Sequence, residues 1–147
     1  MDLITNRTQA DVNRVKELAA KGKAGTWTAA ERNEWLAGMK GAYTYKDFNR
    51  VERAVAEIAG MLGVSVTTVT NWTEKSLIRE ADTQRYLANI QKLRTVCQGL
   101  TNTPATPESM RKMNYVTANN IEKILLDLET VILSWTRCGD VYCGEGG

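Results

Sequence analysis

Apolar residues recur at intervals of three and four along five stretches of this chain, the spacing that places them on one face of an α-helix. The first three stretches each follow a threonine that has an acidic residue three positions later, the arrangement of a capping box. These threonines are Thr8, Thr28 and Thr44. We therefore expect three helices that begin after them, the third ending at Gly63, because glycine readily adopts the left-handed conformation of a helix C-cap.

Two further helices are predicted in the second half of the chain. The fourth stretch begins at Thr83 and keeps an apolar face as far as Cys97. A loop follows, because Pro104 and Pro107 disfavour helix in the residues that precede them. The fifth stretch has the most regular apolar stripe, formed by Ile121, Ile124, Leu125, Leu128, Val131, Ile132 and Trp135. Like Trp35 in the second helix, Trp135 is expected to be buried.

Two segments interrupt the helical pattern. From Val64 to Trp72 β-branched residues are frequent and roughly alternate with others, so residues 64–82 are expected to form an extended connector or a short hairpin. Residues 139–147 contain four glycines and are expected to have no fixed shape of their own. The predicted fold is mainly α, in one structural domain overall. It consists of a three-helix unit (1–63), a β-like Thr/Val-rich connector (64–82), a helical hairpin (83–138) and a glycine-rich C-terminal segment (139–147).

The composition is that of an ordinary globular protein, with 147 residues of which 43% are hydrophobic and 24% charged. The net charge is +2 and both signs are spread evenly, so the chain lacks the basic patch typical of nucleic-acid-binding proteins. No apolar run reaches about 18 residues, and the first residues lack the apolar stretch of a signal peptide. We therefore expect no membrane partner, and a protein that is made in a cytoplasm and leaves it only by lysis.

The absence of histidine excludes much chemistry, because histidine is the usual general base and a common zinc ligand near neutral pH. Three cysteines are too few for a four-cysteine zinc site. We therefore predict no catalytic residue, no metal site and no cofactor. Cys138 and Cys143 could form a disulfide, although free thiols are favoured in a reducing cytoplasm.

Residues 56–72 suggest an alternative function, because they resemble the helix-turn-helix of bacterial regulators. Ala59 is small enough for a close helix crossing, Gly63 suits the turn, and Ser65 could cap a second helix. Under this alternative the protein is a DNA-binding regulator whose second helix faces the major groove. The residues that would contact DNA are Thr67, Thr68, Thr70 and Asn71. This segment contains no arginine or lysine after Ala56, which argues against DNA binding.

Two blocks of residues carry a resemblance that covers almost the whole chain. The N-terminal block consists of Ile4–Val12 with Lys16 and Leu18, Trp35–Tyr43, Asp47, Asn49–Val51 and Ala54–Val55. The C-terminal block consists of Tyr115, Ala118–Asn119, Ile121–Leu128, Gly139–Tyr142 and Gly144–Glu145. With these blocks the sequence resembles a family of small virion structural proteins encoded in the tail regions of phages and prophages of Gram-positive gut bacteria. In that family a Thr- and Val-rich stretch leads to Asp/Asn-Trp-Thr, as in Asn71-Trp72-Thr73 here, which favours the extended interpretation of residues 64–72.

The resemblance implies a non-enzymatic virion protein of the tail or baseplate, whose partners are other virion proteins and copies of itself. In such a role, residues 64–70 could add a strand to a neighbour's sheet, and the C-terminal segment could become ordered on a partner. The candidate assembly contacts are Val64, Val66, Trp72, Val141 and Tyr142. For the C-terminal segment, a frayed terminus is an equal alternative to docking.

Overall fold

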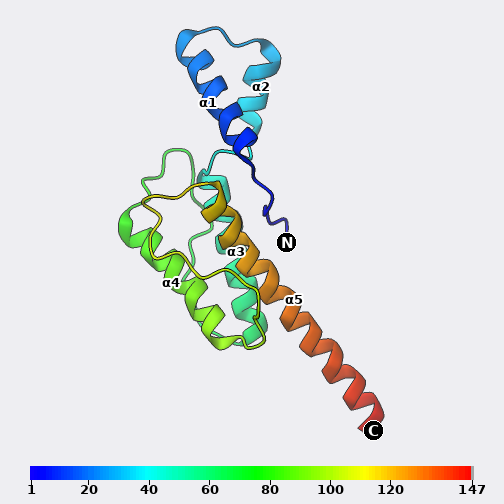
Figure 1. The fold of residues 1–147 in the computed structure, drawn as a ribbon. Coiled ribbons are helices and arrows are strands. Elements are labelled where there is room, and N and C mark those ends of the chain that lie inside the picture. The colour runs from blue at the N-terminus through cyan, green and yellow to red at the C-terminus, as the bar shows by residue number, and fades with distance from the viewer. Residues whose placement is uncertain (147) are drawn as a thin grey trace.

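A computed structural model describes the backbone of residues 1–146 and the side chains of residues 1–135. Five helices follow one another along the chain (Figure 1): α1 (Gln9–Ala24), α2 (Ala29–Ala37), α3 (Tyr45–Leu62), α4 (Glu80–Val96) and α5 (Tyr115–Gly146). No strand occurs within residues 1–146. The prediction of a mainly helical protein is therefore confirmed.

The first three helices begin where the sequence predicted. At α1, the Thr8 hydroxyl accepts a hydrogen bond from the Asp11 N–H, and the Asp11 carboxylate accepts one from the Thr8 N–H. Thr28 and Thr44 form capping boxes at the starts of α2 and α3. Gly63 ends α3 in the left-handed conformation, with φ of 66°, as expected for a glycine C-cap.

The fourth helix begins three residues earlier than predicted, at Glu80 rather than Thr83. The Asp82 carboxylate accepts a hydrogen bond of 2.9 Å from the Arg79 N–H and so satisfies a backbone donor of the first turn. Acidic side chains are also favourable at the positive end of a helix dipole. The polar residues before Thr83 are therefore the first turn of α4, and the connector ends sooner than expected.

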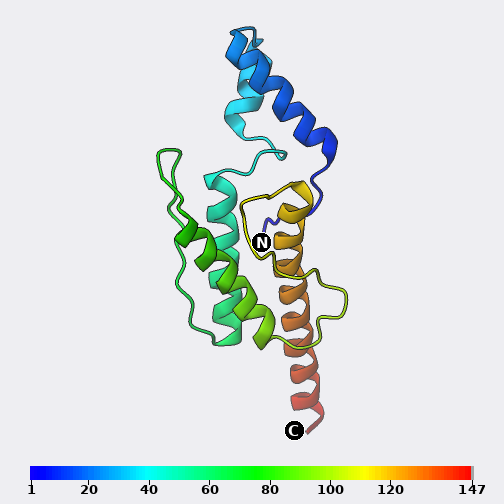
Figure 2. The same ribbon diagram turned by 60° about the vertical axis from the view of Figure 1, so that its left-hand side comes forward.

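The helices form two regions that differ in packing. We call α3, α4 and α5 the bundle, because these three helices pack against one another, and α1 with α2 the hairpin, which stands at one end of the molecule (Figures 1 and 2). Within the hairpin, Leu18 is the one buried side chain of α1, and α2 has none. The bundle core consists of Val51, Ala54, Val55, Ile58, Ala59, Tyr86, Leu87, Ile90, Leu93, Cys97, Ile121, Ile124, Leu125, Leu128 and Ile132.

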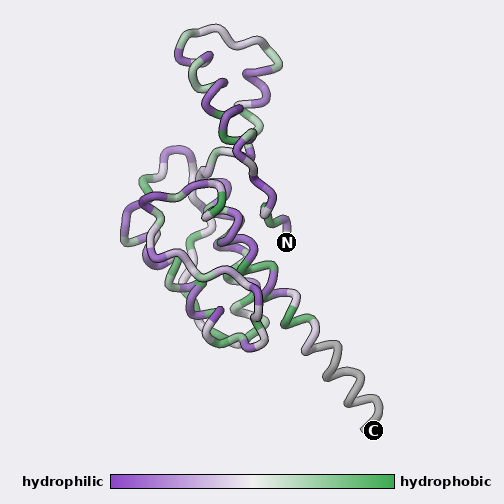
Figure 3. Tube along the Cα trace, viewed as in Figure 1, coloured by the Kyte–Doolittle hydropathy of each residue, from purple (hydrophilic) through white to green (hydrophobic). Residues whose placement is uncertain are grey.

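This grouping differs from the predicted one. The sequence placed the third helix with the first two in residues 1–63, whereas α3 packs against α4 and α5. The apolar face of α3 needs a large apolar surface opposite it, and α4 and α5 provide that surface. Figure 3 shows hydrophobic and hydrophilic positions in both regions, so the regions differ in how much they bury and not simply in composition.

The connector, residues 64–79, is irregular and contains a turn at residues 74–75. The β-like structure predicted for it is not formed, because no other strand lies beside it within residues 1–146. Val64 and Val66 pack against the bundle core instead. The high β propensity of this segment is therefore overridden by its packing against helices.

The last helix is longer than predicted, because α5 continues through the glycine-rich segment to Gly146. A glycine in a helix costs only about 1 kcal/mol relative to alanine, so glycines weaken a helix without forbidding it. α5 extends past the ends of α3 and α4 (Figure 2). Trp135 was expected to be buried but is 46% exposed.

Several predicted features of the C-terminal segment lie outside the described residues. These are the docking of Val141 and Tyr142 and the pairing of Cys138 with Cys143, which depend on side chains after residue 135. Within residues 1–146, no helix is both long enough and apolar enough to cross a bilayer.

Candidate functional site

A buried cluster of four charged side chains joins the N-terminal segment to the bundle. Arg7 Nη2 lies 3.1 Å from Asp47 Oδ1 and 2.7 Å from Glu122 Oε2. Arg50 contacts the same two carboxylates, at 2.6 Å from Asp47 and 2.7 Å from Glu122. Two positive and two negative charges thus compensate one another, as burial of ions requires.

The remaining groups of this cluster are also paired. Arg7 Nε donates to the Lys40 carbonyl at 3.1 Å, and Arg7 Nη1 donates to the Ile4 carbonyl at 2.8 Å. The Asn119 side chain accepts from the Arg7 N–H and donates to the Arg7 carbonyl, both at 2.9 Å. Ile4 N–H donates to Glu122 at 3.0 Å. These contacts use four of the five N–H donors of the Arg7 guanidinium, so the cluster is suited to hold the N-terminal segment on α5.

Two tyrosines lie next to the charged cluster. Tyr43 and Tyr86 form a short hydrogen bond between their hydroxyls, and the Phe48 ring lies within 5.2 Å of both rings, measured between centroids. Burial raises the pKa of Tyr43 and the pKa of Tyr86 above the ordinary tyrosine value. Both side chains are therefore neutral phenols at physiological pH.

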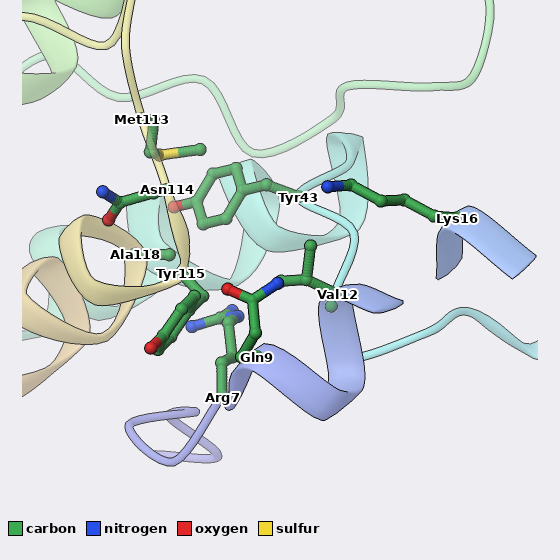
Figure 4. A pocket seen from close by; sticks show the side chains of 10 residues that line it. Arg7, Gln9, Val12, Lys16, Tyr43, Met113, Asn114, Tyr115 and Ala118 are labelled. Carbon is green, nitrogen blue, oxygen red and sulfur yellow. The ribbon is translucent and has the colours of Figure 1, made fainter. Parts of the chain in front are cut away.

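A cavity of about 410 Å³ opens between α1, the loop before α3 and the start of α5 (Figure 4). Its lining consists of Arg7, Gln9, Val12, Lys16, Gly41, Tyr43, Met113, Asn114, Tyr115 and Ala118. The guanidinium of Arg7 is already paired, and the side-chain oxygen Oδ1 of Asn114 accepts a hydrogen bond from the Thr117 N–H to cap α5. The cavity thus lies at the joint between the hairpin and the bundle.

Acidic side chains of the hairpin are used as ion-pair partners. Lys21 Nζ lies 2.5 Å from Glu31, and Arg14 contacts Glu34 through two nitrogens at 2.8 and 3.0 Å. These hydrogen bonds lower the pKa of both glutamates. Among the described residues, no group of three or more His, Cys, Asp or Glu side chains is placed to hold a metal ion.

Three predicted assembly contacts in the connector face the protein itself. Val64 and Val66 cover the bundle core, and Trp72 is half-buried. The Asn49 side chain pairs with the backbone of Trp72, accepting from its N–H and donating to its carbonyl, both at 2.8 Å. Part of the surface of each of these residues is therefore already used within the chain itself.

The backbone of the connector is held by side chains from two helices. Glu52 of α3 accepts a short hydrogen bond from the Val69 N–H. Arg85 and Asn89 of α4 donate to the Thr67 carbonyl at 2.9 and 2.8 Å, and Lys92 donates to the Ser65 carbonyl at 2.6 Å. Because these backbone groups are occupied, the predicted strand addition would have to break existing hydrogen bonds.

The residues proposed for DNA contact do not form a recognition helix. Thr67, Thr68, Thr70 and Asn71 lie in the irregular connector, and α3 is followed by no second helix before residue 80. A helix-turn-helix requires two helices joined by a turn of three or four residues. The arrangement predicted by residues 56–72 is therefore absent.

Two exposed surfaces on the helices were missed by the sequence interpretation. We define the α2 face by Arg32, Trp35 and Leu36, and the α5 face by Leu126, Glu129 and Leu133; each set shares one side of its helix by its spacing of three, four or seven. Leu36 is 63% exposed and Leu133 is 48% exposed. For the α5 face, the signal in the sequence was a pair of leucines seven residues apart that lies off the main apolar stripe.

The buried acids were also missed, although the sequence contains a signal for them. Glu52 and Glu122 lie within the apolar stripes of the third and fifth helices, between residues that are buried. An acid at such a position must be paired when the stripe is buried. Arg85 pairs with Glu52 at 2.7 Å, and Arg50 with Glu122.

Comparison with models of protein families, with curated proteins and with solved structures finds no match to this chain. The function proposed below therefore rests on the geometry of the chain and on the residues that carry the family resemblance.

Proposed function

We propose that this protein is a structural component of a phage virion, placed in the tail or baseplate, that acts by protein-protein assembly and not by catalysis. Its partners are other virion proteins and further copies of itself. It is made in the host cytoplasm and released with the particle by lysis. The residues that resemble the virion family, from Ile4 to Glu145, support this proposal.

The observation that carries the assembly role is the presence of large apolar side chains outside the core. Leu36 and Trp35 are exposed on α2, and Leu126 and Leu133 on α5. Apolar side chains gathered beside a charge are typical of protein interaction surfaces, because their burial against a partner removes apolar area from water. Single exposed apolar residues are common, but here they lie on one side of each helix.

The small core of the hairpin also supports assembly. With one buried side chain in α1 and none in α2, the hairpin gains little stability from its own packing. Short helices of this kind are stabilised mainly by tertiary contacts. A partner protein that covered α2 would provide contacts that the isolated chain lacks.

The experiment that tests this function is mass spectrometry of phage particles purified by density gradient. We expect peptides of this protein in the particle fraction at a constant ratio to known virion proteins across the gradient. A matched lysate fraction without particles is the control. Peptides found only in the lysate, and none in particles, would contradict the proposal.

A further inference from the structure

We infer that the α5 face of one copy packs against the α2 face of the next copy, so that the chain associates with itself head to tail. This inference rests on the assembly role proposed above and names the partner and the surfaces. It concerns Arg32, Trp35 and Leu36 on one side and Leu126, Glu129 and Leu133 on the other.

The two faces match in size. α2 has nine residues, and the α5 face spans the eight residues 126–133. At a rise of about 1.5 Å per residue, both are about 12 to 14 Å long. Each face presents two large apolar side chains with one charged side chain beside them.

The two faces are opposite in charge. Arg32 is exposed and Glu129 half-exposed, and neither forms an ion pair with any side chain described in residues 1–135. By contrast, the neighbouring acids Glu31 and Glu34 on α2 are already paired with Lys21 and Arg14. Arg32 is therefore the charge that α2 has available for a partner, and Glu129 is its counterpart on α5.

The faces belong to different ends of one molecule, and this determines the kind of association. α2 and the middle of α5 lie far apart in both views of the fold, so the contact can form only between copies (Figures 1 and 2). A contact between two different surfaces repeats from copy to copy and produces a ring or a filament. Packing of two α5 faces against each other is unfavourable by comparison. Glu129 lies midway along the face, so the Glu129 carboxylates of the two copies would meet.

The expected affinity is low for a single contact. Two short helices bury less than the roughly 1,200 Å² of total area that is usual for a stable complex. We therefore expect association that becomes measurable at high micromolar concentration, and that strengthens when a ring closes or when other components hold the copies together.

The test is charge reversal followed by mixing, measured by sedimentation velocity of the full chain from about 10 μM to 1 mM, the range expected for a small interface. Arg32→Glu alone and Glu129→Arg alone each place like charges across the contact. Each is expected to weaken association by roughly tenfold at low salt. An equimolar mixture of the two variants is expected to restore it, because every contact in an alternating assembly then joins opposite charges.

Controls separate this contact from folding and from general charge effects. Arg53→Glu reverses an exposed arginine of α3 that has no ion-pair partner among the described side chains, and it should leave association unchanged. Circular dichroism should show unchanged helix content in each variant. Leu36→Gln and Leu133→Gln test the apolar part of the contact, and each should weaken association at least tenfold.

Three results would overturn the inference. The first is a wild-type chain that stays monomeric up to about 1 mM, the upper end of the concentration range. The second is single variants that associate like the wild type, and the third is single variants whose association is weakened and is not restored by mixing. None of these results changes whether the protein is found in purified particles. Failure of the self-association and failure of the proposed function are therefore distinguishable.

Discussion

The hairpin and the bundle are both built from α-helices, but different forces stabilise them. The bundle buries long apolar side chains from three helices in one core. The hairpin buries Leu18 and relies otherwise on ion pairs, on the contact between the Trp27 and Trp35 rings, and on the hydrogen bond from Trp27 Nε1 to the Leu18 carbonyl at 2.6 Å. Exposed ion pairs contribute little, whereas buried apolar area contributes most of the folding free energy.

The signals in a sequence that predict a helix therefore do not indicate how stable that helix is. α1 and α2 have complete capping boxes, yet their local unfolding should cost far less than that of α4, which has no side-chain cap at Arg79. The two regions are joined by the charged cluster of Arg7, Arg50, Asp47 and Glu122.

The largest loss of stability is expected in the charged cluster that joins the N-terminal segment to the bundle. Glu122→Gln removes the negative charge that Arg7 and Arg50 share, and so leaves uncompensated positive charge in a buried position. We expect a loss of about 3–5 kcal/mol in the free energy of unfolding, measured by urea denaturation. Glu57→Gln, at an exposed position of the bundle, is the matched control and should change little. An equal effect of both substitutions would contradict the role of the cluster.

A somewhat smaller effect is expected in the bundle core. Leu125→Ala removes a fully buried side chain, and the cavity it leaves should destabilise the protein by about 3 kcal/mol. Its neighbour Leu126 is 36% exposed, so Leu126→Ala should cost less than about 1 kcal/mol. The two unfolding curves, recorded by circular dichroism, provide a direct comparison on one helix. Similar midpoints would mean that the two positions are packed alike.

A local effect is expected in the hairpin. Leu18→Ala removes its buried side chain, so amide hydrogen exchange in α1 and α2 should accelerate by at least tenfold. Exchange in α3, α4 and α5 should stay unchanged, because the bundle does not depend on Leu18. Lys23→Ala, at an exposed position of α1, is the control. Faster exchange throughout the protein would show that the two regions unfold together.

The smallest change in local stability is expected when the pH is lowered. Hydrogen bonds from Lys21 and Arg14 lower the pKa of Glu31 and Glu34, so the stability these groups contribute is present above the ordinary glutamate pKa of about 4.3 and is lost as the pH falls through their lowered values. Hydrogen exchange of α2 should therefore increase below that pH relative to exchange of α4. In Glu34→Gln this response should shrink. An α2 that responds to acid no more than α4 does would contradict the dependence on ion pairs.

The sequence predicted local features well and long-range ones poorly, and the residues show why. Thr8, Thr28 and Gly63 act on groups within a few positions, so their roles were legible in the sequence. The helix that α3 packs against depends on apolar surfaces far away in the chain, which no local pattern specifies. Trp135 makes the same point, because periodicity tells which side of a helix is apolar but not which part of that side is buried.

Only part of the candidate site could be predicted from the sequence. Trp35 was expected to be buried, but it is 36% exposed on α2. The connector was identified as β-prone, but the side chains that occupy its backbone come from α3 and α4. Contacts of that kind join residues 17 to 27 positions apart in the chain. Such pairs become visible only when the helices are placed in space.

The hydrogen bonds between the N-terminal segment and α5 determine when this segment can be fixed in place during synthesis. The hydrogen bonds from Ile4 to Glu122 and from Arg7 to Asn119 join residues 118 and 112 positions apart, so they cannot form until most of the chain has left the ribosome. At about 5–20 residues per second, the first residues wait roughly 6 to 24 seconds for their partners. The N-terminal segment is thus the first to be made and among the last to be fixed in place. The hairpin can be attached to the bundle in its final position only after Glu122 has been synthesised.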